Sequence, residues 1–181
     1  FEVNKIITFK EINKLSRARI QILGGDYTKN TFGESENKIF DPGNEIEIKF
    51  GYDQKLTVIF EGIILKHSIS IKEGFIKKKS KSLLVIDCVD KAVMLKNIFT
   101  TKVFREKTDD QIINSLINNI PGLSCKIDST NYQHSVLPKY NTDDWSFILQ
   151  RSKLNGLLVL NSNNKVTIKD PSVSNISPKV T

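Results

Sequence analysis

The first half of the chain alternates polar and apolar residues with a period of two. The alternation is clearest at residues 17–22 and 45–50, and a longer run rich in Val, Ile and Phe follows at residues 55–71. Successive side chains of a strand point to opposite faces, so this pattern predicts antiparallel strands with one buried and one solvated face. The turn-forming residues 51–54 join two of these runs as a hairpin. We therefore expect residues 1–95 to curl into an antiparallel sandwich or barrel, and we assign them to a β-barrel domain.

Gly62 lies in the middle of the longest apolar run. Glycine weakens a strand interior, and where it occurs it often marks a bulge, a sharp bend or a close backbone approach. We expect a bulge or bend at Gly62.

A basic run lies between the apolar stretches that end at Ile76 and begin at Leu83. A hairpin tip is expected there, and a solvated tip is the simpler interpretation. A phosphate-binding patch is the alternative, although the aromatic residues of a stacking surface are missing. The residues of this possible basic surface are Lys77, Lys78, Lys79 and Lys81.

After residue 95 the period becomes helical. Thr108 and Gln111 have the spacing of a capping box, and the helix that they open is expected to end at Pro121-Gly122. Its apolar residues fall on one stripe at Ile112, Ile113, Leu116, Ile117 and Ile120. A short strand at residues 124–127 and a polar loop at residues 131–138 are expected to follow.

A second helix is predicted to open at residues 142–144. Trp145 and Ile148 lie on its apolar face, and Gly156 follows its end, where a left-handed conformation is common. Short apolar strands on either side of an Asn-rich turn then predict a hairpin. We assign residues 96–170 to an α/β module and residues 171–181 to a linker or tail. The predicted fold class is α+β, mainly antiparallel β.

Composition and charge restrict the function only weakly. The chain has 181 residues, 39% of them hydrophobic and 26% charged, which suits one large domain or two small ones. Its net charge of +7 is spread along the chain and is weak support for nucleic-acid binding. No apolar run approaches the roughly 20 residues of a membrane helix, and the opening residues have no apolar signal core. Cys88 and Cys125 lie in apolar stretches, which favours reduced structural thiols over a disulfide or redox role.

Residues that could carry chemistry are few. The paired carboxylates, at residues 109–110 and 143–144, both lie in the first turn of a predicted helix, where capping accounts for them. His67 and His134 lack metal-ligand spacing, and no phosphate-binding glycine loop or nucleophile elbow occurs. We therefore expect no enzyme, no metal and no cofactor.

The order of several residues in the second half resembles a known family. Phe104 precedes the first predicted helix, which is capped by Thr108. Farther along, the chain carries Tyr140, Asp144, Trp145, Phe147 and Gly156 in that order. This order resembles the N-terminal hub region of VgrG-type spike proteins of type VI secretion and of the related tail-hub proteins of contractile phages, which include the baseplate hub and late control protein D.

The resemblance extends upstream and includes two departures. Phe60 and Gly62 lie in a stretch similar to the family's aromatic-x-Gly-aliphatic strand, and the similarity is weak before Glu45. Thr142 replaces a frequent Glu, and a frequent Arg is shifted by one place to Arg151. We interpret the two changes as an altered salt bridge.

The resemblance implies a structural hub. In the family, three copies that each contribute two similar β-barrels form a ring of pseudo-sixfold symmetry between a hexameric tube protein and a downstream spike domain. It also implies assembly in the bacterial cytoplasm, or in a phage-like particle, followed by outward ejection. This chain would be a hub fragment and a homotrimer in the full-length protein.

The motif residues have an ordinary structural interpretation as well. Trp145 and Phe147 are expected to anchor a helix to a sheet more than to contact a partner, because aromatic residues at helical spacing usually face the core. Tyr140 and Asp144 suit local hydrogen bonding or capping equally well.

Two functions of other classes stay open. A basic β-barrel that binds nucleic acid would show binding that weakens steeply with salt. An enzyme, such as a wall hydrolase fused to an injection device, has no candidate residues in this sequence.

Overall fold

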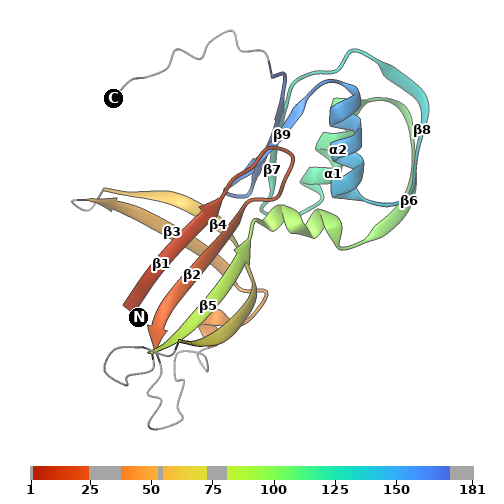
Figure 1. The fold of residues 1–181 in the computed structure, drawn as a ribbon. Coiled ribbons are helices and arrows are strands. Elements are labelled where there is room, and N and C mark those ends of the chain that lie inside the picture. The colour runs from red at the N-terminus through yellow and green to blue at the C-terminus, as the bar shows by residue number, and fades with distance from the viewer. Residues whose placement is uncertain (1, 25–37, 53–54, 73–80, 172–181) are drawn as a thin grey trace.

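The first part of the chain forms one antiparallel sheet. The computed structural model describes residues 2–24, 38–52, 55–72 and 81–171. Five strands follow the order β1-β2-β5-β4-β3 across the sheet, and the sheet curls (Figure 1). Among the described residues, β1 pairs only with β2, and β3 pairs only with β4, so the curled sheet is open between its two edges. The strands are β1 (Glu2–Phe9), β2 (Arg17–Gly24), β3 (Glu45–Tyr52), β4 (Lys55–Lys72) and β5 (Lys81–Val89).

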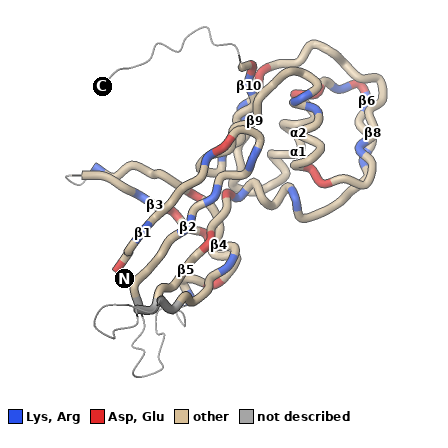
Figure 2. Tube along the Cα trace, viewed as in Figure 1, with Lys and Arg blue, Asp and Glu red and all other residues tan. Residues whose placement is uncertain are grey.

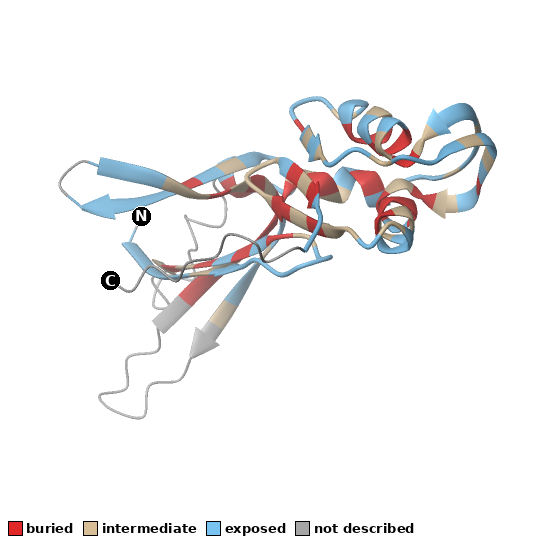
Figure 3. Ribbon diagram, turned by 90° about the horizontal axis from the view of Figure 1, so that it is seen from above, coloured by how far each residue is buried: buried red, intermediate tan, exposed pale blue. Residues whose placement is uncertain are grey.

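Strand β4 changes its neighbour along its length. Residues 55–63 pair with β3, and residues 63–72 pair with β5. The β3–β4 hairpin therefore extends beyond the rest of the sheet as an exposed arm (Figure 3). The predicted hairpin between residues 50 and 55 is confirmed, and its tip at residues 53–54 lies outside the described residues.

Two bulges lie on either side of Gly62. The register shifts by one residue at Ile59 against β3 and at Leu65 against β5. A side chain at position 62 would clash with β5, because a Cβ atom there would lie 2.2 Å from the carbonyl oxygen of Val89. The irregularity predicted at Gly62 thus takes the form of two flanking bulges and a close backbone approach.

One face of the sheet, here called the inner face, holds a hydrophobic core. Alternate residues of β2 and β5 supply much of it, and the short 3-10 helix η2 (Lys38–Phe40) contributes Phe40. This is the buried face that the period-two pattern predicts. The core residues are Ala18, Ile20, Ile22, Phe40, Ile48, Phe60, Ile64, Leu84, Ile86 and Cys88.

The second part packs two helices against two small sheets. β7, β10 and β9 form a three-stranded sheet in which β7 and β10 are parallel, and β6 and β8 form an antiparallel ribbon. The elements are the 3-10 helix η3 (Lys91–Lys96), β6 (Phe99–Thr108), α1 (Asp109–Asn118), β7 (Ser124–Ile127), β8 (Gln133–Asp143), α2 (Asp144–Leu154), β9 (Leu158–Ser162) and β10 (Lys165–Lys169). With the first sheet, they confirm the predicted mainly antiparallel α+β fold.

The two α-helices form where their N-terminal capping residues and apolar faces predict them. Thr108 caps α1, and its backbone N–H donates to Gln111 Oε1 at 3.2 Å. The apolar stripe of α1 is buried together with Trp145, Ile148 and strands of the three-stranded sheet. Gly156 follows α2 with a φ of +69°, which is the left-handed conformation expected there.

The prediction of a polar loop at residues 131–138 is wrong from residue 133 onward. Gln133–Asp143 form β8, which pairs with β6 from Phe99 to Thr108. The polar residues and Pro138 concealed this strand in the sequence. A two-stranded ribbon has a free edge on each strand, so it tolerates a proline that a central strand would exclude.

The junction between the two parts is polar. Asn13 N–H donates to the Val159 carbonyl at 2.8 Å, and Val159 N–H donates to Asn13 Oδ1 at 3.0 Å. Buried Asp90 caps η3 at Ala92 and accepts a bond from Asn164 N–H at 2.9 Å. Ala92 packs in the hydrophobic core of the second part, together with residues of α1 and α2. The domain boundary expected at residue 95 stays a prediction. No helix in the described part of the chain is long and apolar enough to cross a membrane.

Candidate assembly site

Three aromatic motif residues, Phe104, Trp145 and Phe147, pack in the hydrophobic core of the second part, which also holds apolar residues of α1. Trp145 and Phe147 on α2 are 2% and 4% exposed, and Phe104 of β6 stacks on Phe147 with ring centroids 6.1 Å apart. Tyr140 is 80% exposed. Among these aromatic residues, only Tyr140 offers a wide surface to a partner.

Asp144 holds α2 to the β6–β8 ribbon. Its carboxylate forms an ion pair with Lys139, whose side chain is wholly buried on β8. Lys139 Nζ also donates to Thr100 Oγ1 at 2.6 Å, on β6. A buried ammonium group needs such partners because desolvation of an unpaired charge is costly. Asp144 is therefore a structural counterion that fixes the start of α2.

Asp109 and Arg151 join the two helices. Arg151 Nε and Nη2 donate to the two carboxylate oxygens of Asp109 at 2.7 and 2.9 Å. Asn155 Nδ2 donates to Asp109 Oδ2 at 2.8 Å, and His134 Nε2 lies 3.3 Å from the same oxygen. Tyr132 packs edge-on against the His134 ring, with centroids 4.8 Å apart. The network ties the start of α1 to the end of α2.

Helix capping alone does not account for the paired carboxylates at residues 109–110 and 143–144. In this respect the interpretation from the sequence is wrong. Asp143 is a helix cap and accepts from Ser146 N–H at 2.8 Å. Asp110 accepts from the Thr130 hydroxyl at 2.7 Å, while Asp109 and Asp144 form the ion pairs described above. The position of each acidic residue in its helix is visible in the sequence, but its side-chain partner, Thr130, Lys139 or Arg151, is not.

The pKa shifts of Asp109 and of the two cysteines suit structural roles. Burial raises the pKa of Asp109, but hydrogen bonds from Arg151, Asn155 and His134 outweigh it and leave the pKa below its usual value. Burial raises the pKa of Cys88 to about 12 and that of Cys125 to about 11, so both free thiols are protonated at neutral pH.

The histidines have separate surroundings. His67 Nδ1 lies 2.9 Å from the Phe40 carbonyl oxygen, to which it donates, whereas His134 belongs to the Asp109 network. Within the described ranges, no group of three His, Cys, Asp or Glu side chains gathers as a metal site.

Two apolar surfaces are exposed at the ends of the molecule. The arm surface is the exposed end of the β3–β4 hairpin. Phe50 and Tyr52, 60% and 81% exposed, share one face, and Leu56, 60% exposed and paired with Gly51, lies on the other. The rings of Phe50 and Tyr52 pack edge to face at 6.0 Å. The ribbon surface, on β6 and β8, consists of Val103, Val136 and Tyr140, exposed by 53%, 52% and 80%.

The basic run proposed as a possible surface lies almost wholly outside the described residues. Lys77, Lys78 and Lys79 fall in the undescribed segment 73–80, and only the backbone of Lys81, at the start of β5, is described. Lys and Arg recur elsewhere, including on β6 and β8 (Figure 2).

Comparison with known proteins identifies the family. The Alg8 N-terminal domain family matches residues 1–180, which is almost the whole chain. The chain belongs to the Alg8 N-terminal domain family. No curated protein matches the sequence.

Solved structures with this family member's fold include several tail proteins. The prophage MuSo2 43 kDa tail protein from Shewanella oneidensis matches with a TM-score of 0.69 at 12% identity, over 92% of this chain and 49% of that chain. The E. coli c3393 protein, described as a component of the type VI secretion system with similarity to T4 bacteriophage tail proteins, matches with a TM-score of 0.63 at 13% identity, over 93% and 46%. A tail protein from Neisseria meningitidis MC58 gives 0.62 at 12% identity, over 94% and 47%.

These matches show a shared fold. The chain spans about half the length of each of these three proteins. This chain therefore has the tail-hub-like fold that the order of motif residues indicated. The narrower assignment to VgrG-type proteins remains a proposal.

Sequence reasoning missed three features of the site. Buried Lys139 and the Arg151–Asp109 pair depend on contacts between distant segments. The displaced arginine at position 151 was a usable signal, since it pointed to an altered salt bridge, although its partner could not be read from the sequence. The arm surface was hidden within an ordinary amphipathic strand.

Proposed function

We propose that the chain is a structural hub component of a contractile injection device, either a type VI secretion system or a phage-tail-like particle. The similarity of its fold to tail proteins over more than nine-tenths of the chain is the observation that carries this proposal. In the proposed assembly, three copies form a ring that joins a tube protein to a spike. Assembly takes place in the bacterial cytoplasm or in a phage-like particle, before outward ejection.

The exposed arm supports an assembly role. An isolated two-stranded hairpin is at best marginally stable in water, and exposed apolar patches commonly mark protein interaction sites. Phe50, Tyr52 and Leu56 extend on such a hairpin, and aromatic residues are enriched in interface cores. We propose that the arm surface packs against a neighbouring protomer in the ring.

The proposed motif roles are structural. Phe60, Gly62, Phe104 and Phe147 support the fold, whereas Tyr140 is the motif residue that we propose for a contact. The chain needs no cofactor for this function, which depends on shape and on interfaces.

We predict that replacing the three residues of the arm surface with serine disrupts self-association without unfolding the protein. The side chains are already exposed, so the melting temperature should change little. Loss of interface anchors commonly costs more than 1 kcal/mol each, so the association constant should fall by at least about 100-fold. Sedimentation velocity on the complete gene product measures the change.

A matched variant controls for loss of exposed apolar side chains. Met94, Ile98 and Leu154 are also exposed, and their triple replacement by serine should leave self-association within about threefold of the original protein. A complete gene product that stays monomeric at high concentration would contradict the hub proposal. Equal effects of the two triple variants would contradict the role of the arm.

A further inference from the structure

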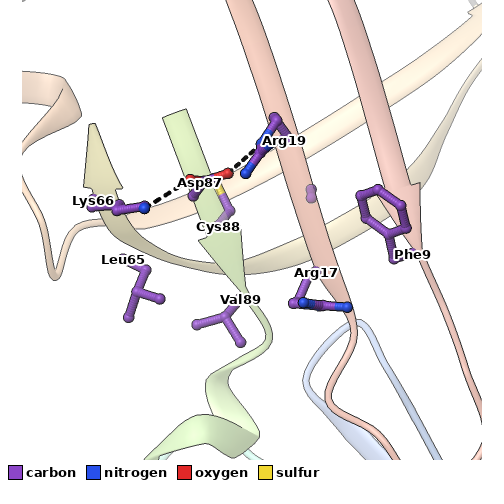
Figure 4. Close-up of a pocket in the computed structure, with 9 residues that line it drawn as sticks. Phe9, Arg17, Arg19, Leu65, Lys66, Asp87, Cys88 and Val89 are labelled. Atoms are coloured by element: carbon purple, nitrogen blue, oxygen red, sulfur yellow. Dashed lines mark hydrogen bonds and ion pairs between the residues drawn. The ribbon is translucent and has the colours of Figure 1, made fainter. Parts of the chain in front are cut away.

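The outer face of the first sheet, opposite its core, carries a hollow of about 340 Å³. Because Ala18 and Ile20 face the core, the alternation of β2 turns Arg17 and Arg19 to the outer face. Pairing with β5 and β4 brings Asp87 and Lys66 into the same row as Arg19 (Figure 4).

Asp87 is the one carboxylate among the described residues that line this hollow. Asp87 accepts from Arg19 Nε at 2.6 Å and lies 3.6 Å from Lys66 Nζ. Arg17 lies over the Phe9 ring, 5.7 Å from its centroid. Glu11, outside the lining, is 3.6 Å from Arg17 and closer to Lys14, at 2.5 Å. The hollow is thus basic, with an apolar part formed by Phe9, Leu65 and Val89.

A second hollow of about 350 Å³ adjoins the first. Both are lined by Arg17 and Val89, and the second continues across the junction to Trp145 and Leu149 of α2. Lys14 and Lys96 line it, and none of its described lining residues is an Asp or Glu. Among the residues that the structure describes, the two hollows contain the cations Lys14, Arg17, Arg19, Lys66 and Lys96 and one carboxylate, Asp87.

We propose that the two hollows form one groove that binds an acidic segment of a partner protein. Carboxylates of the segment would pair with Arg17, Arg19 and Lys96, and its apolar side chains would cover Leu65, which is 54% exposed. The proposal rests on the proposed role as an assembly component, and it assigns this face to a partner of acidic and apolar chemistry. Excess positive charge at such a face favours a partner of opposite potential.

The lining favours a protein over a nucleic acid. A phosphate backbone would leave Leu65 and Leu149 without apolar partners and would approach the Asp87 carboxylate. Arg17 lies over one face of the Phe9 ring, so that face is not free for the base stacking that single strands use.

Fluorescence anisotropy with a labelled eight-residue peptide of alternating Glu and Leu tests the groove, with the full chain as receptor. The same peptide with Gln in place of Glu should bind at least tenfold more weakly. The triple variant Arg17→Gln, Arg19→Gln, Lys96→Gln should weaken binding of the acidic peptide at least tenfold. Asp87→Asn should strengthen it about threefold, because a repelling charge is removed.

A matched variant loses the same charge elsewhere. Lys126→Gln, Lys165→Gln, Lys169→Gln changes exposed residues of the three-stranded sheet and should leave the dissociation constant within twofold. Melting curves of both triple variants establish that they fold.

Several results would overturn the groove. One is equal affinity for the Glu and Gln peptides. Another is an equal loss of acidic-peptide affinity in the two triple variants, and a third is weaker binding of that peptide by Asp87→Asn. Tighter binding of a 20-residue oligodeoxythymidine than of the acidic peptide, lost in the groove variant, would assign the face to nucleic acid. Self-association of the complete gene product is measured in parallel. If it persists when peptide binding fails, the groove is wrong and the hub role stands.

Discussion

Replacing Arg151 with methionine is expected to lower the free energy of unfolding by about 3–5 kcal/mol, because it leaves the carboxylate of Asp109 buried without its cation. Asp109 is 2% exposed and receives two hydrogen bonds from the Arg151 guanidinium. Methionine keeps much of the aliphatic volume of arginine, so the change tests the charge more than the packing. Urea unfolding followed by circular dichroism measures the loss.

Two further variants separate charge from fold. Arg105→Met removes an exposed arginine from β6 and should change stability by less than about 0.5 kcal/mol. Combining Asp109→Asn with Arg151→Met removes both charges and should recover much of the loss, since no uncompensated charge stays buried. A cost below about 1 kcal/mol for Arg151→Met alone would mean that Asp109 is solvated without it.

The same network gives stability an acid dependence. The pKa of Asp109 is lowered in the folded protein, so its ionised form stabilises the fold above the unfolded pKa of about 3.9, and this contribution is lost as pH falls through the folded pKa. Unfolding measured from pH 6 down to pH 2 should therefore show a decline at the acid end. Asp109→Asn should flatten that decline. An unchanged slope in the variant would contradict the assignment.

The parts of the fold that could be predicted are those with local signals. Period-two alternation located β2 and β3, a run rich in Val, Ile and Phe located β4, and the capping box at Thr108 located α1. Gly156 marked the end of α2 because its left-handed conformation is a local requirement. In each case the determining residues are close together in the chain.

What could not be predicted depends on distant partners. Residues Gln133–Asp143 form β8 because they pair with β6, although their own sequence is typical of a polar loop. Lys139 is buried only because Asp144 and Thr100 supply its partners. The basic groove gathers residues from both parts of the chain, so neither the spacing nor the overall charge of the sequence could reveal it.

The tail-hub resemblance succeeded for a related reason. Its motif combined core aromatics with a helix boundary, and these describe a fold even when identity falls to 12–13%. Residues that pack in a core or cap a helix indicate an architecture more than a contact surface. The arm surface and the basic groove had to be found from exposure and charge.

Replacing Gly62 with alanine is expected to be as damaging as the loss of Arg151, for a steric reason. The added Cβ would lie 2.2 Å from the Val89 carbonyl oxygen and 2.8 Å from its carbonyl carbon. These are backbone atoms of β5, which pairs with both β2 and β4, so they cannot move without disturbing the sheet. We expect the free energy of unfolding to fall by about 3 kcal/mol or more.

Gly156→Ala is the matched control for this change. Gly156 has a φ of +69°, but a Cβ atom added there would meet no other atom within 4 Å, so alanine should cost only the backbone strain of about 1–2 kcal/mol. Urea unfolding of both variants gives the comparison. A loss at Gly62 no larger than that at Gly156 would show that β4 can shift away from Val89. A larger loss at Gly62 would show that the close approach of β4 to the Val89 backbone of β5 stabilises the sheet.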